Sequence, residues 1–162
     1  MKKIALLVCL LIASVAAQAQ FEKGKWLVNP SVTGLGLVHY NETDKTAFGL
    51  DVHGGAFLMD NVALLVHGAA QWNQSGGDTD VYTLGVGGRY YFSQVGIYLG
   101  ANVNVERYDF GHDQDDTDFS VGLEAGYAFF LSRTVTLEPA VFWNINGDRS
   151  RYGLKVGFGF YF

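Results

Sequence analysis

The chain has 162 residues, of which 49% are hydrophobic and 15% aromatic, and its 11 basic and 16 acidic residues give a formal net charge of −5. An acidic chain without a basic patch argues against a nucleic-acid partner. Its length fits one domain, and no run of about 18 apolar residues after residue 20 predicts a transmembrane helix.

Residues 1–19 have the pattern of a secretory signal peptide. Two lysines precede the apolar run 4–15, and Ala17-Gln18-Ala19 fits a small-x-small cleavage site. The run is shorter than the roughly 20 residues that cross a membrane as a helix. Cleavage after Ala19 would remove both lysines and the only cysteine, leaving nine basic and 16 acidic residues and a charge of −7 on the domain 20–162. Disulfides would then not stabilise this exported domain.

Beyond residue 20, apolar and polar residues alternate with a period of two, which is typical of strands with one apolar and one polar face. Short turns alternate with longer polar loops, as in outer-membrane barrels. Each segment reaches the about 9 to 11 residues that cross a membrane on a tilted strand. The eight predicted strands are 25–40, 46–58, 62–73, 81–92, 96–108, 119–131, 134–145 and 152–162.

The last predicted strand indicates the fold class. Large apolar residues occupy every second position from Tyr152 to Phe162, so one whole face of this strand requires an apolar cover. Lipid provides that cover for a transmembrane strand, whose backbone pairs only with neighbouring strands. We predict an all-β fold, an eight-stranded antiparallel up-and-down transmembrane β-barrel. A soluble lipocalin-like barrel is the alternative, but it would crowd this aromatic face into its interior.

The outward aromatic residues are predicted to form two girdles around an aliphatic belt, the lipid-facing pattern of such barrels. The girdle near the long loops comprises Tyr40, Trp72, Tyr82, Phe119, Trp143 and Tyr152. The girdle near the short turns comprises Trp26, Tyr90, Phe92, Tyr127, Phe129, Phe160 and Phe162.

The inward face carries six charged residues: Arg89, Lys155, Glu124, Glu138, Asp51 and Glu106. The interior of an eight-stranded barrel is just wide enough for side chains, and buried charges require partners. We therefore predict a structural salt-bridged network that fills the lumen. A proton or ion path through the same residues is the alternative.

Two histidines also point inward. If the connection 59–61 is a three-residue turn, His53 pairs with His67 across the hairpin, with Asp51 nearby on the same face. Two histidines and a carboxylate can bind a transition metal, but a site requires a third or fourth fixed ligand. We interpret them as a structural pair in the lumen and predict no metal and no cofactor.

Two prolines, Pro30 and Pro139, fall inside predicted strands. A closed sheet has no edge at which a missing N–H donor is tolerated. We expect each proline at a bulge or a locally unpaired position.

A lipid-modifying hydrolase is the enzymatic alternative. Such an enzyme needs a nucleophile beside a base at the membrane boundary. The inward serines, Ser31 and Ser120, have no His–acid spacing around them. We predict no enzymatic activity and name no catalytic residue.

The chain from about residue 21 onward resembles small outer-membrane β-barrel proteins, including the porin-like barrel domain of OmpA-type proteins. The resemblance lies in Phe57–Leu64, Gly87–Phe92 and the terminal Phe158–Phe162. Unlike OmpA-type proteins, the chain shows no following peptidoglycan-binding domain.

This resemblance implies an integral protein of the Gram-negative outer membrane with a structural, envelope-integrity or surface-interaction role. A narrow porin-like channel for small or apolar solutes is the alternative. The expected partners are outer-membrane lipid, lipopolysaccharide and, through Tyr152–Phe162, the barrel-assembly machinery. We expect a monomer.

Overall fold

The computed structural model describes residues 21–33, 39–40, 47–73, 80–92, 95–109, 115–147 and 149–162, so the predicted signal peptide lies outside the described residues. Within these ranges no helix is long and apolar enough to cross a membrane. The strands are β1 (Trp26–Thr33), β2 (His39–Tyr40), β3 (Ala47–Met59), β4 (Val62–Asn73), β5 (Asp80–Phe92), β6 (Ile97–Asp109), β7 (Asp115–Tyr127), β8 (Phe129–Phe130), β9 (Val135–Asn146) and β10 (Arg149–Tyr161).

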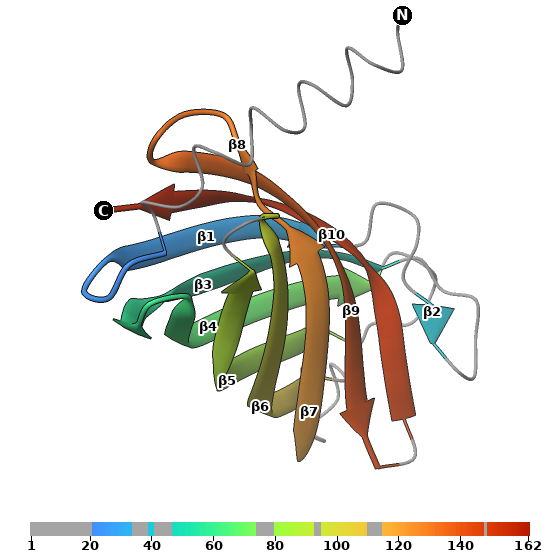
Figure 1. Cartoon of the computed structure of the whole chain (residues 1–162). Helices are drawn as coiled ribbons and strands as arrows, with labels where there is room; N and C mark the ends of the chain where they lie inside the picture. The colour runs from blue at the N-terminus through green and yellow to red at the C-terminus, as the bar shows by residue number, and fades with distance from the viewer. Residues whose placement is uncertain are drawn as a thin grey trace, which may run out of the picture.

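The strands close into one antiparallel barrel. Consecutive strands from β3 to β7 pair with each other, β3 also pairs with β1, and β7 also pairs with β9. Strand β10 pairs with β9 on one side and with β1 and β2 on the other. Segments β7 and β8 both pair with β9, and β1 and β2 both pair with β10, so the ten labelled segments form an eight-stranded barrel. In Figure 1 the C-terminus lies beside the start of β1, and β2 lies at the opposite end. The predicted fold class is confirmed.

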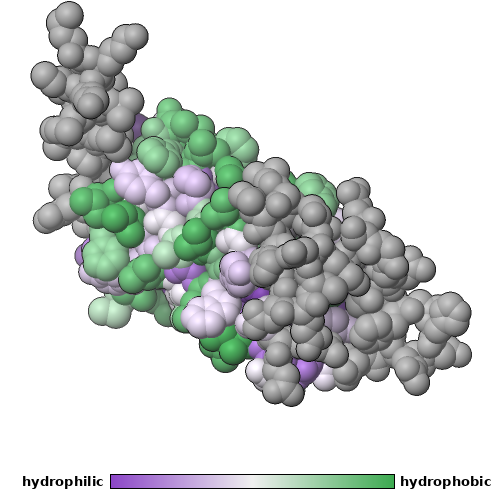
Figure 2. Space-filling view, turned by 90° about the vertical axis from the view of Figure 1, so that its right-hand side faces the viewer, coloured by the Kyte–Doolittle hydropathy of each residue, from purple (hydrophilic) through white to green (hydrophobic). Residues whose placement is uncertain are grey.

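Side chains alternate strictly between the two faces of the wall. In β5, for example, Tyr82, Leu84 and Val86 are exposed, whereas Val81 and Thr83 are buried. Most exposed large side chains in the described strands are apolar or aromatic, and most buried polar side chains point inward. Figure 2 shows hydrophobic residues over much of the outer wall. This polarity is the inverse of that of a soluble barrel and rules out the lipocalin-like alternative.

The hairpin between β3 and β4 contains a shorter turn than the three residues considered above. Met59 pairs with Val62, so the turn is formed by Asp60 and Asn61, and Asn61 adopts a left-handed conformation with φ of 67°. A register shift between Phe57 and Met59 offsets the missing residue. Because of this bulge, His53 still pairs with His67.

Both prolines lie where a strand ladder is interrupted, as expected from their missing donor. The β1–β10 ladder runs through Val28–Phe160 and resumes at Ser31–Gly157, so Pro30 has no partner in β10. The β7–β9 ladder ends at Gly126–Ala140 and resumes beyond Pro139 as the β8–β9 ladder in the same register. By contrast, the ladder between β9 and β10 is continuous.

Candidate functional site in the barrel lumen

The centre of the lumen is occupied by Arg89, which β5 directs inward and which is fully buried. Its Nε donates to Glu124 Oε1 at 2.5 Å and its Nη1 donates to Glu138 Oε2 at 3.2 Å. The guanidinium also lies over the ring of Tyr98, with Cζ 4.4 Å from the ring centroid. One cation thus joins carboxylates from β7 and β9, which a guanidinium with several fixed donors is suited to do.

A second cation extends this network towards β3. Lys155 Nζ lies 2.6 Å from Glu124 Oε2 and 3.4 Å from Asp51 Oδ2. It also lies 3.2 Å from His53 Nε2. Lys155 therefore links two of the predicted acidic residues, and Glu124 is shared by both cations.

Glu138 receives donors from three other side chains besides Arg89. Asn29 Nδ2 donates to it at 3.1 Å, and the hydroxyls of Thr136 and Tyr161 donate at 2.7 Å each. Glu138 is almost completely buried, and an ionised carboxylate in such a place is stabilised only when its oxygens accept hydrogen bonds or pair with cations.

His53 and His67 stack with their ring centroids 4.8 Å apart. His53 Nε2 also lies 3.2 Å from Asp51 Oδ2. In the described part of the chain, no group of three or more His, Cys, Asp or Glu side chains is arranged to hold a metal ion.

A second polar cluster lies nearer the long-loop end, around Glu106. Arg151 Nη2 lies 3.5 Å from Glu106 Oε1, and Arg151 Nη1 donates to Gln71 Oε1 at 2.7 Å. The hydroxyls of Ser120 and Tyr108 donate to Glu106 at 2.7 Å and 2.6 Å. Arg151 lies outside the predicted strand 152–162, but it is an inward residue of β10. Extending the alternation of Tyr152, Leu154 and Val156 backwards indicates this.

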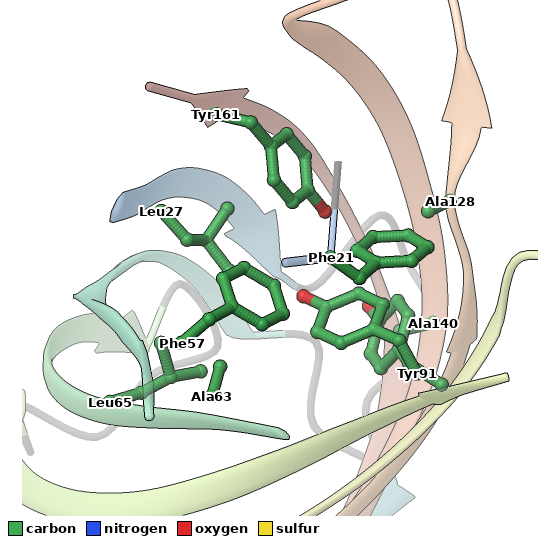
Figure 3. Packing of buried hydrophobic residues seen from close by; sticks show 10 residues of the cluster. Phe21, Leu27, Phe57, Ala63, Leu65, Tyr91, Ala128, Ala140 and Tyr161 are labelled. Atoms are coloured by element: carbon green, nitrogen blue, oxygen red, sulfur yellow. The ribbon is translucent and has the colours of Figure 1, made fainter. Parts of the chain in front are cut away.

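The short-turn end of the lumen is closed by an aromatic cluster centred on Phe21. The ring of Phe21 is 1% exposed and stacks on Tyr91 with ring centroids 4.3 Å apart. Figure 3 shows it between Tyr91 and Tyr161, with Phe57 alongside. The Asn61 N–H donates to the Phe21 carbonyl at 2.6 Å, and the Gly24 N–H donates to the Phe57 carbonyl at 2.8 Å. We name Phe21, Phe57, Tyr91, Phe130 and Tyr161 the aromatic stopper. Because Phe21 precedes the first strand, strand periodicity does not predict this cluster.

The predicted girdle residues whose side chains are described lie on the outer wall. Phe160 and Tyr127 are half-buried there, and the side chain of Tyr40 is not among those described. The others are exposed: Trp26, Trp72, Tyr82, Tyr90, Phe92, Phe119, Phe129, Trp143, Tyr152 and Phe162.

A closed barrel with an apolar outer wall and a hydrogen-bonded polar lumen defines an integral β-barrel membrane protein. The chain belongs to the family described as outer membrane protein beta-barrel domain, whose sequence model matches residues 5–162. It is therefore a protein of the outer membrane, as the sequence predicted.

Solved structures of outer-membrane proteins have the same fold. Neisserial surface protein A has a TM-score of 0.69 and 18% identity, over 85% of this chain and 96% of that chain. The N-terminal barrel domain of Pseudomonas aeruginosa OprF has a TM-score of 0.62 and 14% identity, over 86% and 98%. Ail, the attachment invasion locus protein of Yersinia pestis, has a TM-score of 0.56 and 14% identity, over 87% and 99%. No curated protein matches the chain in sequence.

Proposed function

We propose that this outer-membrane barrel is a non-enzymatic, plugged protein with a structural, envelope-integrity or surface-interaction role. The observation that carries the proposal is the bridge from Arg89 of β5 to Glu138 of β9, with Glu124 of β7 bound to the same guanidinium. Bridging side chains in the middle of the lumen obstruct solute passage. The aromatic stopper blocks the short-turn end independently of them.

A small polar space in the described part of the lumen supports a plug rather than the alternative narrow channel. The enclosed space beside Asp51, His67 and Arg151 has a volume of about 30 Å³. A buried water needs about 10–15 Å³, so the space corresponds to about two waters and not to a continuous column.

The inward serines support the non-enzymatic assignment over the hydrolase alternative. The Ser31 hydroxyl donates to the backbone carbonyl of Asp51, and the Ser120 hydroxyl donates to Glu106. A serine nucleophile requires a base that accepts its proton, whereas a carbonyl and a paired carboxylate leave these hydroxyls in structural hydrogen bonds.

Conductance in planar lipid bilayers tests the plug. We expect no stable unitary steps from the wild-type barrel, whereas a variant that combines Phe21→Ala with Arg89→Ala should conduct. A Glu22→Ala variant, altered at an exposed neighbour of Phe21, serves as the matched control and should stay silent. Stable steps from the wild-type protein would favour the channel.

The cellular role is tested in the native host by deleting the gene and measuring sensitivity to detergent and bile salts. An envelope-integrity role predicts that the deletion strain is more sensitive than the wild type. Both the wild-type gene and the non-bridging Arg89→Met variant should restore resistance, provided the variant reaches the membrane. Unchanged sensitivity of the deletion strain would favour the surface-interaction role. That role is measured as the binding of intact bacterial cells to surfaces of other cells.

We further propose that the barrel is a monomer that contacts lipopolysaccharide and is assembled through its last strand. Chemical crosslinking in cells tests the oligomeric state and the assembly through the last strand. A photoreactive residue in place of Phe158 on the outward face of β10 should crosslink to the assembly machinery during synthesis, and mature protein should give no crosslinked dimer.

A further inference from the structure

The outer wall has a hollow that the lumen-based function does not use. It has a volume of about 760 Å³ and crosses β6, β7, β9 and β10. A second hollow of about 390 Å³ shares Ala125, Val141 and Leu154 with it and extends to Ile97 and Tyr127. We name the two together the lateral groove. Its main outward side chains are Leu99, Leu123, Ala125, Val141, Trp143 and Leu154.

The hollow results from one short side chain in a row of longer ones. Ala125 pairs with Leu99 on β6 and with Val141 on β9, and Val141 pairs with Leu154 on β10. Along β7, the next outward residues on either side of Ala125 are Leu123 and Tyr127, because same-face neighbours on a strand are two residues apart. Ala125 is therefore the floor, and larger side chains form the walls.

We propose that the lateral groove binds one acyl chain of a membrane phospholipid. The groove is continuous with the lipid-facing wall of an outer-membrane protein, so acyl chains already surround it. Filling an apolar hollow restores the dispersion contacts that its lining would otherwise lack. An unbranched flexible chain can follow a groove that crosses four strands.

The chemistry of the lining selects a phospholipid over lipopolysaccharide. None of the six outward side chains named above is charged. A lipid that carries several phosphates is recognised by lysine and arginine side chains, which the groove does not direct outward. At one end, the paired Trp143 and Tyr152 supply aromatic rings of the kind that lie at a membrane interface.

A second copy of the chain fits the groove less well. A two-fold symmetric dimer places the same patch of each subunit opposite itself. Two concave grooves would then face each other and enclose a larger hollow instead of filling it.

Native mass spectrometry of barrel purified from outer membranes in mild detergent tests the proposal. We expect a species with one bound phospholipid, and we expect Ala125→Phe to abolish it because the added ring fills the floor. Ala70→Phe is the matched control, since Ala70 lies on the outer wall at a position in β4 outside the groove. Heat-modifiable gel migration shows that each variant is folded.

A second measurement locates the lipid without depending on its survival in detergent. In a Trp26→Phe, Trp72→Phe background, Trp143 is the only tryptophan of the chain. We expect brominated phosphatidylethanolamine, titrated into vesicles, to quench Trp143 with saturation at a low mole fraction. In the same background with Ala125→Phe, quenching of Trp143 should rise in proportion to the mole fraction of brominated lipid and should not saturate.

Absence of the lipid-bound species, its persistence in Ala125→Phe, a bound mass equal to lipopolysaccharide, or a dimer would each overturn the proposal. If quenching of Trp143 in the protein that retains Ala125 rises only in proportion to the mole fraction of brominated lipid, the proposal is overturned as well. The proposal concerns the outer wall, so these outcomes leave the plugged lumen untouched.

Discussion

Arg89 of β5 and Glu124 of β7 meet at 2.5 Å over Gly100 of β6, which pairs with both of them in the wall. Because Gly100 has no side chain, the two long side chains can meet over it on the inner face of the wall. This contact holds two parts of the ring together independently of main-chain hydrogen bonds.

Replacing Arg89 by Met should destabilise the barrel strongly. Removing one partner of a buried ion pair costs about 3–5 kcal/mol, because the remaining charge is left uncompensated. The free energy of unfolding in lipid vesicles, measured by urea titration, checks this. Arg133→Met, at an exposed turn position, should change it by no more than about 0.5 kcal/mol.

The Arg89 prediction has an internal test. Glu124 still pairs with Lys155 in Arg89→Met, whereas Glu138 is left without a cation. Adding Glu138→Gln removes that unpaired charge, so part of the stability should return. A double variant as unstable as the sum of its single variants would show that Arg89 and Glu138 do not interact energetically.

Phe21→Ala should destabilise the barrel by about 3–5 kcal/mol, the usual cost of replacing a buried phenylalanine by alanine. The ring contacts Tyr91, Tyr161, Phe57 and Phe130 inside the barrel end. Thermal unfolding followed by gel migration measures the effect, with Glu22→Ala as control. Equal melting temperatures for the two variants would mean that the stopper does not stabilise the barrel.

An arginine on the outer wall should be costly only near the middle of the membrane. Val86 lies in the middle of β5, where it pairs with Val66 and Val103, and Val86→Arg should cost about 2–4 kcal/mol. Leu58→Arg, beside the short turn, should cost about 0–1 kcal/mol. Urea titrations of both variants in the same vesicles compare them, and equal costs would contradict the depth assigned to Val86.

Gly159 provides space for the carboxylate of Glu138. A methyl group added at Gly159 would collide with Glu138 Oε1 and Thr136 Oγ1. Gly159→Ala should therefore cost about 1–3 kcal/mol, as overpacked sites do. At Gly54 the added methyl group meets nothing within 4 Å, so Gly54→Ala is the control. Equal unfolding free energies for the two variants would contradict the packing around Glu138.

The amino-terminal prediction is checked by the intact mass of protein isolated from the outer membrane. Cleavage after Ala19 predicts a chain that begins at Gln20, with no cysteine. Ala19→Leu should leave a heavier precursor, because the cleavage site requires a small residue. A wild-type mass that includes residues 1–19 would disprove the signal peptide.

The period-two pattern predicted the strands and their faces because one face meets lipid and the other meets the lumen. Their outer ends were less predictable: β10 begins at Arg149 instead of at Tyr152, and β7 begins at Asp115 instead of near Phe119. Main-chain pairing between strands continues at these ends, although the outward positions are no longer occupied by apolar residues. Hydrophobic periodicity therefore underestimates strand length at these ends.

The individual contacts in the lumen were less accessible from the sequence. Odd or even position along a strand indicates whether a side chain faces lipid or the lumen. It does not show which cation pairs with which carboxylate inside the barrel. Phe21 lies outside any strand, so periodicity gives it no direction. The pairing of His53 with His67 was obtained from an assumed three-residue turn, whereas the structure reaches the same pairing with a two-residue turn and a bulge.

The interrupted ladders at Pro30 and Pro139 border the same hairpin, β9–β10, one on each side. The two strands of this hairpin are joined to each other by a continuous ladder. A ring of strands must part somewhere before it can unfold, and it parts most easily where main-chain hydrogen bonds are missing. We therefore expect the β9–β10 hairpin to separate from the barrel as a unit, its two borders losing protection from hydrogen exchange before the other described ladders.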